Sequence, residues 1–311
     1  MADRKAAQRP RSEPARPKAA QRAEGERRRA PAGPASEGGP PQGRPPIRVD
    51  AEVVENRREG GANHRLVLRV PGWPGFEPGQ FVMLSPGPLT AAPRSDPLLP
   101  RPMAVYRARG VDGAAEVEIL YKRSGRGTAL LAEALPGQRV SVVGPLGRGF
   151  AAPEPGERAL LVAGGTGVAS VYELAARLAG TNEVAVLLGA RTSGELMGIE
   201  DFTALGVDLR LATEDGSRGA RGLVTELLEA ALDEPGPACI YACGPTPMMR
   251  RCAEIAAARG RPCIASLENQ MACGFGVCLG CAVPLAAGGF ALLCRDGPML
   301  AADAVAWEAL P

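Results

Sequence analysis

The first half of the chain alternates short apolar stretches with turn-forming residues. Glycine and proline punctuate six such stretches, which are residues 47–57, 64–70, 80–85, 103–108, 115–121 and 139–144. Short stretches bounded in this way are typical of the strands of a small antiparallel barrel or sandwich. Residues 86–100 are too rich in proline for either a strand or a helix, so we expect a surface loop there.

The pattern changes from about Arg158 onward, where apolar strand-like stretches alternate with helical periodicity. Strands are predicted at 159–163, 183–190, 207–213 and 238–244, and helices at 168–179, 221–232 and 246–259. This alternation predicts a parallel, doubly wound sheet. Regular patterning thins out after Pro262, which leaves a tail of about fifty residues that is rich in cysteine and glycine. A sheet of that length needs a cross-link to stay compact, and bound metal could supply it.

The N-terminal segment differs from the rest in composition. Residues 1–46 contain no Leu, Ile, Val or aromatic residue, and they hold 11 Lys and Arg against 5 Asp and Glu. Such a segment cannot bury enough apolar surface to offset the entropy of ordering, so we predict a disordered basic tail. It is either a solvated linker or a binding arm. The other residues carry 25 basic against 29 acidic side chains, which argues against nucleic-acid binding by the folded part.

The chain has no apolar run long enough to cross a bilayer and no secretory signal at its start. We therefore expect a cytoplasmic protein without a membrane segment. All eight cysteines lie between Cys239 and Cys294, whereas a secreted disulfide framework would staple the whole chain. Metal chemistry in a reducing compartment fits this distribution better.

Four cysteines near the C-terminus have the spacing of a two-iron, two-sulfur (2Fe-2S) cluster. They follow C-x4-C-x2-C, then twelve residues, then C, which is the plant-type ferredoxin spacing. The predicted ligands are Cys273, Cys278, Cys281 and Cys294. Gly274, Gly276 and Gly280 would let backbone amides turn toward sulfur. A structural zinc site is the alternative interpretation of the same residues.

Two glycine-containing turns follow predicted parallel strands. The stretch LLVAGGTGVAS at 160–170 contains Gly164, Gly165, Thr166 and Gly167 before a helix, whose N-terminus would offer amide donors to a pyrophosphate. The stretch YACGPTPMM at 241–249 places Cys243, Gly244 and Pro245 after the last predicted parallel strand. Open sheets bind ligands at the carboxyl ends of their strands. Together the two turns favour a nicotinamide nucleotide.

Two stretches in the barrel are candidates for a second cofactor. Arg101 opens RPMAVY and is able to clamp a phosphate, and Gly127 with Thr128 opens a helix in YKRSGRGTALL. Taken alone, each is more often an ordinary barrel edge or helix cap than a cofactor site. His64, the only histidine, lies beside an apolar strand, so histidine acid-base catalysis is not expected.

Taken in order, these motifs resemble the electron-transfer subunits of NAD-dependent dihydroorotate dehydrogenases, which belong to the ferredoxin reductase family. The resemblance covers roughly residues 47–300, and its most specific parts are SLENQMACGFGVCLGCAVP and CRDGPML. It implies three folded parts, which are an FAD-binding antiparallel β-barrel at 47–153, an NAD-binding α/β domain at 154–262 and a 2Fe-2S module at 263–311.

The resemblance also implies which residues contact the cofactors. Flavin contacts would be Arg101, Pro102, Met103, Ala104, Leu120, Tyr121, Lys122, Gly127 and Thr128. Ala104 departs from the usual serine, which removes one hydroxyl hydrogen bond worth about 1 kcal/mol. Cys243, with Gly244, would line the nicotinamide pocket and act catalytically by positioning the ring. The cluster would exchange electrons with a catalytic, FMN-containing partner in a heterotetramer of two plus two, in pyrimidine biosynthesis.

Two other functions remain open from the sequence. The chain resembles, less specifically, flavin and iron-sulfur subunits of other complexes, such as a sulfide dehydrogenase or a ferredoxin–NADP reductase. A non-catalytic scaffold with structural zinc belongs to a different class and would contain no iron. Arg191 and Ser193 follow the second parallel strand and leave the choice between NAD and NADP undecided by the residues alone.

Overall fold

The structure, a computed structural model, describes residues 45–90 and 96–310. The predicted disordered tail lies outside the described residues except for Pro45 and Pro46, and so does the middle of the predicted 86–100 loop. The described parts of that loop, 86–90 and 96–100, contain no helix or strand. Among the helices of the described ranges, none is long and apolar enough to cross a membrane.

The N-terminal half forms a seven-stranded antiparallel sheet with the strand order β4-β3-β7-β1-β2-β6-β5. Its strands are β1 (Ile47–Gly60), β2 (Asn63–Pro71), β3 (Phe81–Leu84), β4 (Arg101–Ala104), β5 (Arg107–Val111), β6 (Ala114–Lys122) and β7 (Arg139–Leu146), and α1 (Arg126–Ala132) precedes β7. The stretch predicted as one strand at 103–108 is thus divided between β4 and β5, because Val105 and Tyr106 form the link between them.

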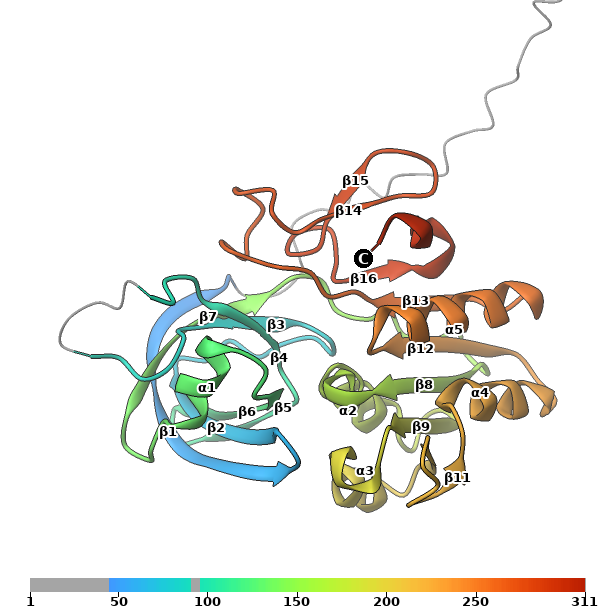
Figure 1. Cartoon of the computed structure of the whole chain (residues 1–311), viewed down its shortest axis with the longest axis horizontal. Helices are drawn as coiled ribbons and strands as arrows, with labels where there is room; N and C mark the ends of the chain where they lie inside the picture. The colour runs from blue at the N-terminus through green and yellow to red at the C-terminus, as the bar shows by residue number, and fades with distance from the viewer. Residues whose placement is uncertain (1–44, 91–95, 311) are drawn as a thin grey trace, which may run out of the picture. The chain divides into compact units, whose positions relative to one another are not determined.

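This sheet curls on itself, as the ribbon in Figure 1 makes visible. The strands β4 and β5 lie at opposite ends of the sheet order, yet only two residues separate them in sequence. The amide of Tyr106 in this link donates to the Glu118 carbonyl on β6. The long strand β1 pairs with β7 through its first part and with β2 through its second, with a register shift between Val53 and Glu55 that bends it. The result is the predicted barrel-like fold.

The second half forms a seven-stranded sheet with the order β11-β10-β9-β8-β12-β13-β16. Its strands are β8 (Arg158–Gly164), β9 (Val184–Ala190), β10 (Asp208–Thr213), β11 (Ala220–Arg221), β12 (Ala238–Cys243), β13 (Cys263–Ser266) and β16 (Met299–Ala301). All neighbours pair in parallel except β13 with β16. The chain leaves β8 toward β9 on one side and later returns to β12 on the other, so the strand order reverses beside β8.

Helices cover both faces of this sheet, as expected for a doubly wound fold. The helices are α2 (Val168–Leu178), α3 (Ile199–Ala204), α4 (Val224–Asp233) and α5 (Thr246–Ala258). Alternate residues of β8 divide between two cores: Leu160 packs with α4 and α5, whereas Leu161 packs with α2 and α3. The helix α3 was not predicted, because its six residues are too few to display helical periodicity.

The cysteine-rich tail is joined to the parallel sheet. The strands β13 and β16 belong to that sheet, so the boundary predicted at residue 262 falls before its last two strands. Between them, β14 (Ala282–Pro284) and β15 (Phe290–Leu292) form a small hairpin. Val283 and Leu293 are buried in the same core as α4 and α5, which places the cysteine loops against the sheet domain.

Candidate functional site

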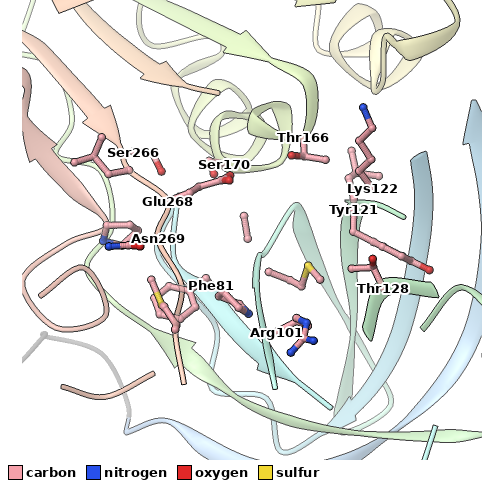
Figure 2. A pocket seen from close by; sticks show the side chains of 18 of the residues that line it. Phe81, Arg101, Tyr121, Lys122, Thr128, Thr166, Ser170, Ser266, Glu268 and Asn269 are labelled. Carbon is pink, nitrogen blue, oxygen red and sulfur yellow. The ribbon is translucent and has the colours of Figure 1, made fainter. Parts of the chain in front are cut away.

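A cavity of about 290 Å³ lies where three parts of the chain meet. Its walls come from the antiparallel sheet, from the turn between β8 and α2, and from the segment that follows β13. Figure 2 places Ser266, Ser170, Glu268 and Asn269 on one side and Tyr121, Lys122 and Thr128 on the other. We call it the central cavity.

Eight of the nine predicted flavin contacts line the central cavity, and they are Arg101, Pro102, Met103, Ala104, Leu120, Tyr121, Lys122 and Thr128. The ninth, Gly127, is buried under the Arg101 guanidinium, since an added Cβ would lie 2.7 Å from Arg101 Nε. A larger residue at 127 would therefore displace this arginine. The segments that motif reasoning singled out in the barrel do converge on one hollow.

The Thr128 hydroxyl has a structural use of its own. It donates to the Gly125 carbonyl and accepts from the amides of Ser124 and Gly125, each at 3.0 Å. These bonds close the turn that opens α1 and leave Arg101 and Lys122 as the charged groups of this wall. A bound phosphate would therefore meet one of these two cations rather than the threonine hydroxyl.

One wall of the central cavity was missed by sequence reasoning. It consists of Ser266, Leu267, Glu268, Asn269 and Met271, together with Ser170 on α2. The SLENQM stretch at 266–271 carries the signal, because it belongs to the most specific part of the family resemblance. Glu268, the one carboxylic acid of this wall, is exposed to the open cavity, and desolvation by the surrounding protein raises its pKa.

Cys243 is fully buried and lies behind the wall, not on it. Burial, with the nearby Glu268 carboxylate, raises the pKa of its thiol to about 12 and outweighs the opposing effect of the Ser170 and Ser266 hydroxyls. The thiol is therefore neutral at pH 7 and unsuited to nucleophilic attack. Cys243 itself does not line the central cavity, whereas its serine neighbours Ser170 and Ser266 do, and its place at the nicotinamide stays a prediction.

The two predicted nucleotide turns interlock at the carboxyl ends of β8 and β12, beside the reversal of strand order. A Cβ on Gly167 would overlap the Cys243 carbonyl, and one on Gly244 would lie 3.0 Å from the Gly164 backbone. Gly244 also has a φ of 155°, which other residues rarely adopt. The glycines thus permit a backbone approach that side chains would block.

A second pocket of about 580 Å³ opens over these turns. Gly165, Pro245 and Met248 line it near β8 and β12, and Gly189 and Glu214 line it near β9 and β10. Its position at the carboxyl edge is where open sheets bind nucleotides. Thr166 lines the central cavity and Lys122 lines both hollows, so the two are adjacent. We call it the nucleotide pocket.

Arg191 and Ser193 are the two residues that bear on the choice between NAD and NADP. Of these, only Arg191 lines the nucleotide pocket. Its guanidinium pairs with Glu195 at 2.6 Å, and Glu214 adds a second negative charge to its surroundings. The backbone amide of Ser193 donates to the Ser217 hydroxyl outside that pocket. The arginine is thus already neutralised by carboxylates.

The four predicted cluster ligands lie on two adjacent loops, all as free thiols. The sulfurs of Cys281 and Cys294 are 3.2 Å apart. Two sulfurs that bind one tetrahedral metal at about 2.3 Å lie roughly 3.8 Å apart. The Cys281 and Cys294 sulfurs would therefore need to separate by only about 0.6 Å to bind one iron. The side chains of Cys273 and Cys278 interact with each other, and a charge on Cys273 contributes to raising the pKa of Cys294.

The loop backbone favours thiolate at the exposed end of this cysteine set. Although burial opposes it, amides of Cys278, Phe275 and Val277 point at the sulfur and lower the pKa of Cys273 to about 6. Gly274 and Gly276 have φ values of 84° and 87°, as predicted for a loop that turns its amides inward. The third residue with positive φ in this loop is Leu279, not Gly280.

At the inner end, burial and the neighbouring Cys281 sulfur raise the pKa of Cys294 to about 12. Iron would neutralise the crowded thiolates there. Within the described ranges, no three His, Cys, Asp or Glu side chains surround a single-ion position. A 2Fe-2S cluster instead takes four thiolates shared between two irons. The donor set, the two sulfur pairs and the inward amides fit such a cluster.

Two family profiles match the chain. The iron-sulfur cluster binding domain of dihydroorotate dehydrogenase B matches residues 268–306 and begins at Glu268 on the cavity wall. The oxidoreductase NAD-binding domain matches residues 161–254, which include both glycine turns.

Curated relatives align over most of their length. The dihydroorotate dehydrogenase B (NAD(+)) electron transfer subunit of Bacillus caldolyticus is 42% identical over 235 residues, covering 74% of this chain and 86% of the relative. The probable subunit of the same name from Methanopyrus kandleri is 38% identical over 254 residues, covering 81% and 89%.

Solved structures share the fold. A chain of the NADH-dependent reduced ferredoxin–NADP oxidoreductase, studied for flavin-based electron bifurcation, superposes with a TM-score of 0.73 at 28% identity, covering 83% of this chain and 90% of that one. The ferredoxin reductase of carbazole 1,9a-dioxygenase superposes with a TM-score of 0.58 at 25% identity, covering 70% and 67%.

Proposed function

The chain belongs to the family of dihydroorotate dehydrogenase B electron-transfer subunits, and from this premise we propose that it carries electrons between NAD(H) and a catalytic partner. In the proposal, FAD binds in the central cavity, NAD(H) binds in the nucleotide pocket, and Cys273, Cys278, Cys281 and Cys294 hold a 2Fe-2S cluster. Bound FAD would supply a hydride acceptor for NADH, and the cluster would supply one-electron transfer.

The observation that carries the proposal is the continuity of the cavity wall with the cluster loop. The wall ends at Met271, and the first cluster ligand is Cys273. Two residues of extended chain span at most about 7 Å, so cavity and cluster are close neighbours. An added Cβ on Gly274 would lie 2.7 Å from Met83 on β3, which fixes the loop against the barrel.

The chain's own residues have separate tasks in this arrangement. Arg101 would pair with the flavin pyrophosphate, and Met103 and Leu120 would form an apolar wall that excludes water. The Gly164–Gly167 turn would present amides to the dinucleotide phosphates. Cys243, neutral and buried, would position the nicotinamide ring through Ser170 and Ser266 rather than react with it.

The partner is proposed to be the FMN-containing catalytic subunit that oxidises dihydroorotate, in a two-plus-two assembly in the cytoplasm. The test is co-expression of this chain with the catalytic subunit from the same source. Dihydroorotate should then reduce NAD⁺ only when both subunits are present, and light scattering should give the mass of a heterotetramer. A catalytic subunit that reduces NAD⁺ unaided would overturn the proposal.

The similarity to the ferredoxin–NADP oxidoreductase chain supports a second candidate, in which the same conduit serves another complex. The two candidates differ in the electron donor rather than in the chemistry of this chain. Adding dihydroorotate to the coupled assay separates the two candidates, because turnover supports the first. A chain that NADH reduces, but that accepts no electrons from the catalytic subunit and dihydroorotate, supports the second.

Three large apolar side chains surround the exposed ligand Cys278. Phe275, Val277 and Leu279 are 59%, 75% and 62% exposed, and we call them the apolar rim. Exposed apolar residues are ordinary when scattered, but three within five positions around an electron-carrying site are typical of an interface. We place the catalytic partner there.

Introducing a charge into the apolar rim should weaken partner binding. We expect Val277→Asp to lower the affinity for the catalytic subunit by about tenfold or more, because a carboxylate would have to be desolvated. Titration calorimetry measures this, and the cluster absorption should stay unchanged. Leu135→Asp, on an exposed leucine of the barrel remote in sequence from the cysteine loop, is the matched control. Equal affinities for the two variants would contradict this placement.

A further inference from the structure

A largely buried group of charges joins the barrel to the nucleotide domain, and none of its members lines the central cavity or the nucleotide pocket. Asp201 on α3 accepts hydrogen bonds from Arg65 Nη2 at 2.6 Å, from Arg107 Nη1 at 2.9 Å and from the Tyr106 hydroxyl at 2.8 Å. All three donors belong to the barrel. A single carboxylate of the nucleotide domain is therefore held by three barrel side chains.

A second carboxylate completes the group from inside the barrel. Glu118 on β6 accepts from Arg65 and from Arg107, each at 2.6 Å. Arg65 also pairs with Glu59. The side chain of Arg65 is only 5% exposed and that of Glu118 9%, so these charges depend on one another rather than on water. We call these residues the Asp201 network.

Aromatic rings extend the Asp201 network to α2. The Arg65 and Arg107 guanidinium carbons lie 5.1 and 5.7 Å from the centre of the Tyr106 ring, and Tyr106 packs against Tyr172 at 4.4 Å. Tyr172 in turn contacts Phe202 on α3 edge to face. The space is tight, since a Cβ on Gly198 would lie 2.8 Å from the Tyr106 hydroxyl.

The elements joined by the network are also elements that form the cofactor sites. Glu118 precedes Leu120, Tyr121 and Lys122 on the same strand, and these three residues line the central cavity. Tyr172 lies on α2, which begins directly after the Gly164–Gly167 turn. The central cavity draws walls from both domains, so its shape depends on how the domains are held together.

We propose that Asp201 is a positioning residue that sets the barrel against the nucleotide domain, so that the two rings of the hydride transfer meet at a reactive distance. This inference rests on the proposed function, because it assigns flavin and nicotinamide to the two adjacent hollows. Though burial opposes it, the bonds from Arg65 and Tyr106 hold the pKa of Asp201 below its ordinary value. The carboxylate is thus ionised throughout the neutral range.

The test compares two variants that each remove the charge of a carboxylate paired with two arginines. Asp201→Asn keeps the shape of the side chain but leaves Arg65 and Arg107 without their shared charge. Glu234→Gln is the matched control, because it weakens the Arg158–Glu234 pair at 2.7 Å, which lies wholly within the nucleotide domain. If Asp201→Asn does not fold, Arg107→Lys is used in its place, because it weakens the bonds from Arg107 to Asp201 and Glu118.

We expect Asp201→Asn to slow flavin reduction by NADH about tenfold or more, since small misplacements of reacting groups have effects of this size. Flavin and iron content should match the wild type, and Glu234→Gln should transfer hydride at the wild-type rate. Hydrogen exchange, which needs no cofactor turnover, should rise in α3 and β5 of the Asp201 variant only. Wild-type exchange at α3 and β5 in that variant, or an equal slowing in both variants, would overturn the inference.

The exchange measurement keeps this inference separate from the proposed function. If the wild-type protein is not reduced by NADH, the proposed function fails whatever the variants do. If it is reduced, and Asp201→Asn alone loosens the contact and slows reduction, both stand. If it is reduced and Asp201→Asn changes neither quantity, only the positioning role is lost.

Discussion

Replacing Cys294 with serine should leave the protein with its flavin but without its cluster. Cys294 is buried beside the Cys281 sulfur, and a hydroxyl is a poor substitute for thiolate as an iron ligand. We expect iron to fall from about two atoms per chain to less than roughly a tenth of that. Metal analysis and visible absorption of anaerobically purified protein measure the change.

The matched control for this prediction is Cys252→Ala. Cys252 is a fully buried thiol on α5, outside both cysteine loops, so its loss should cost some stability but no iron. Should Cys294→Ser retain its iron while remaining folded, the ligand assignment would be wrong. Zinc in place of iron in the wild-type protein would support the scaffold alternative instead.

Gly167→Ala is expected to have the second large effect. The added methyl would overlap the Cys243 carbonyl, and the two nucleotide turns would have to move apart. Overpacking of this kind costs about 1–3 kcal/mol of stability. Because both turns form the nucleotide pocket, a displacement near 1 Å should slow NADH-dependent flavin reduction by about 100-fold. Stopped-flow absorbance and thermal unfolding measure the two effects.

Gly110→Ala provides the comparison for Gly167→Ala. Gly110 lies on β5, and an added Cβ there would meet no atom within 4 Å. It should reduce flavin at the wild-type rate. If Gly167→Ala also did so, with unchanged stability, the interlocked turns would have no part in nucleotide binding.

Local patterns predicted most of the secondary structure, and the errors have identifiable physical causes. The alternation from residue 158 onward predicted β8, α2, β9, β10, α4, β12 and α5, since each buries a face with its own period. The strands β13 and β16 were missed as members of the sheet because four and three residues carry no periodicity. Their pairing is set by contacts remote in sequence.

The candidate site likewise has parts that the sequence predicted and parts that it did not. Cysteine spacing identified four residues that interact with one another in the structure, and the family resemblance identified the barrel residues that line one cavity. The wall at 266–271 and the burial of Cys243 depend on how β12, β13 and α2 meet, which no single stretch encodes. Asp201 was beyond prediction, because its partners Arg65 and Arg107 are 136 and 94 residues away in the chain.

We propose above that this chain accepts electrons from NADH and passes them internally to a cluster. The direct measurement is the visible spectrum of the chain, purified anaerobically without any partner, before and after addition of NADH. We expect flavin and iron-sulfur absorption at the start and bleaching of both after NADH is added. A colourless, zinc-containing protein that does not respond to NADH would contradict it.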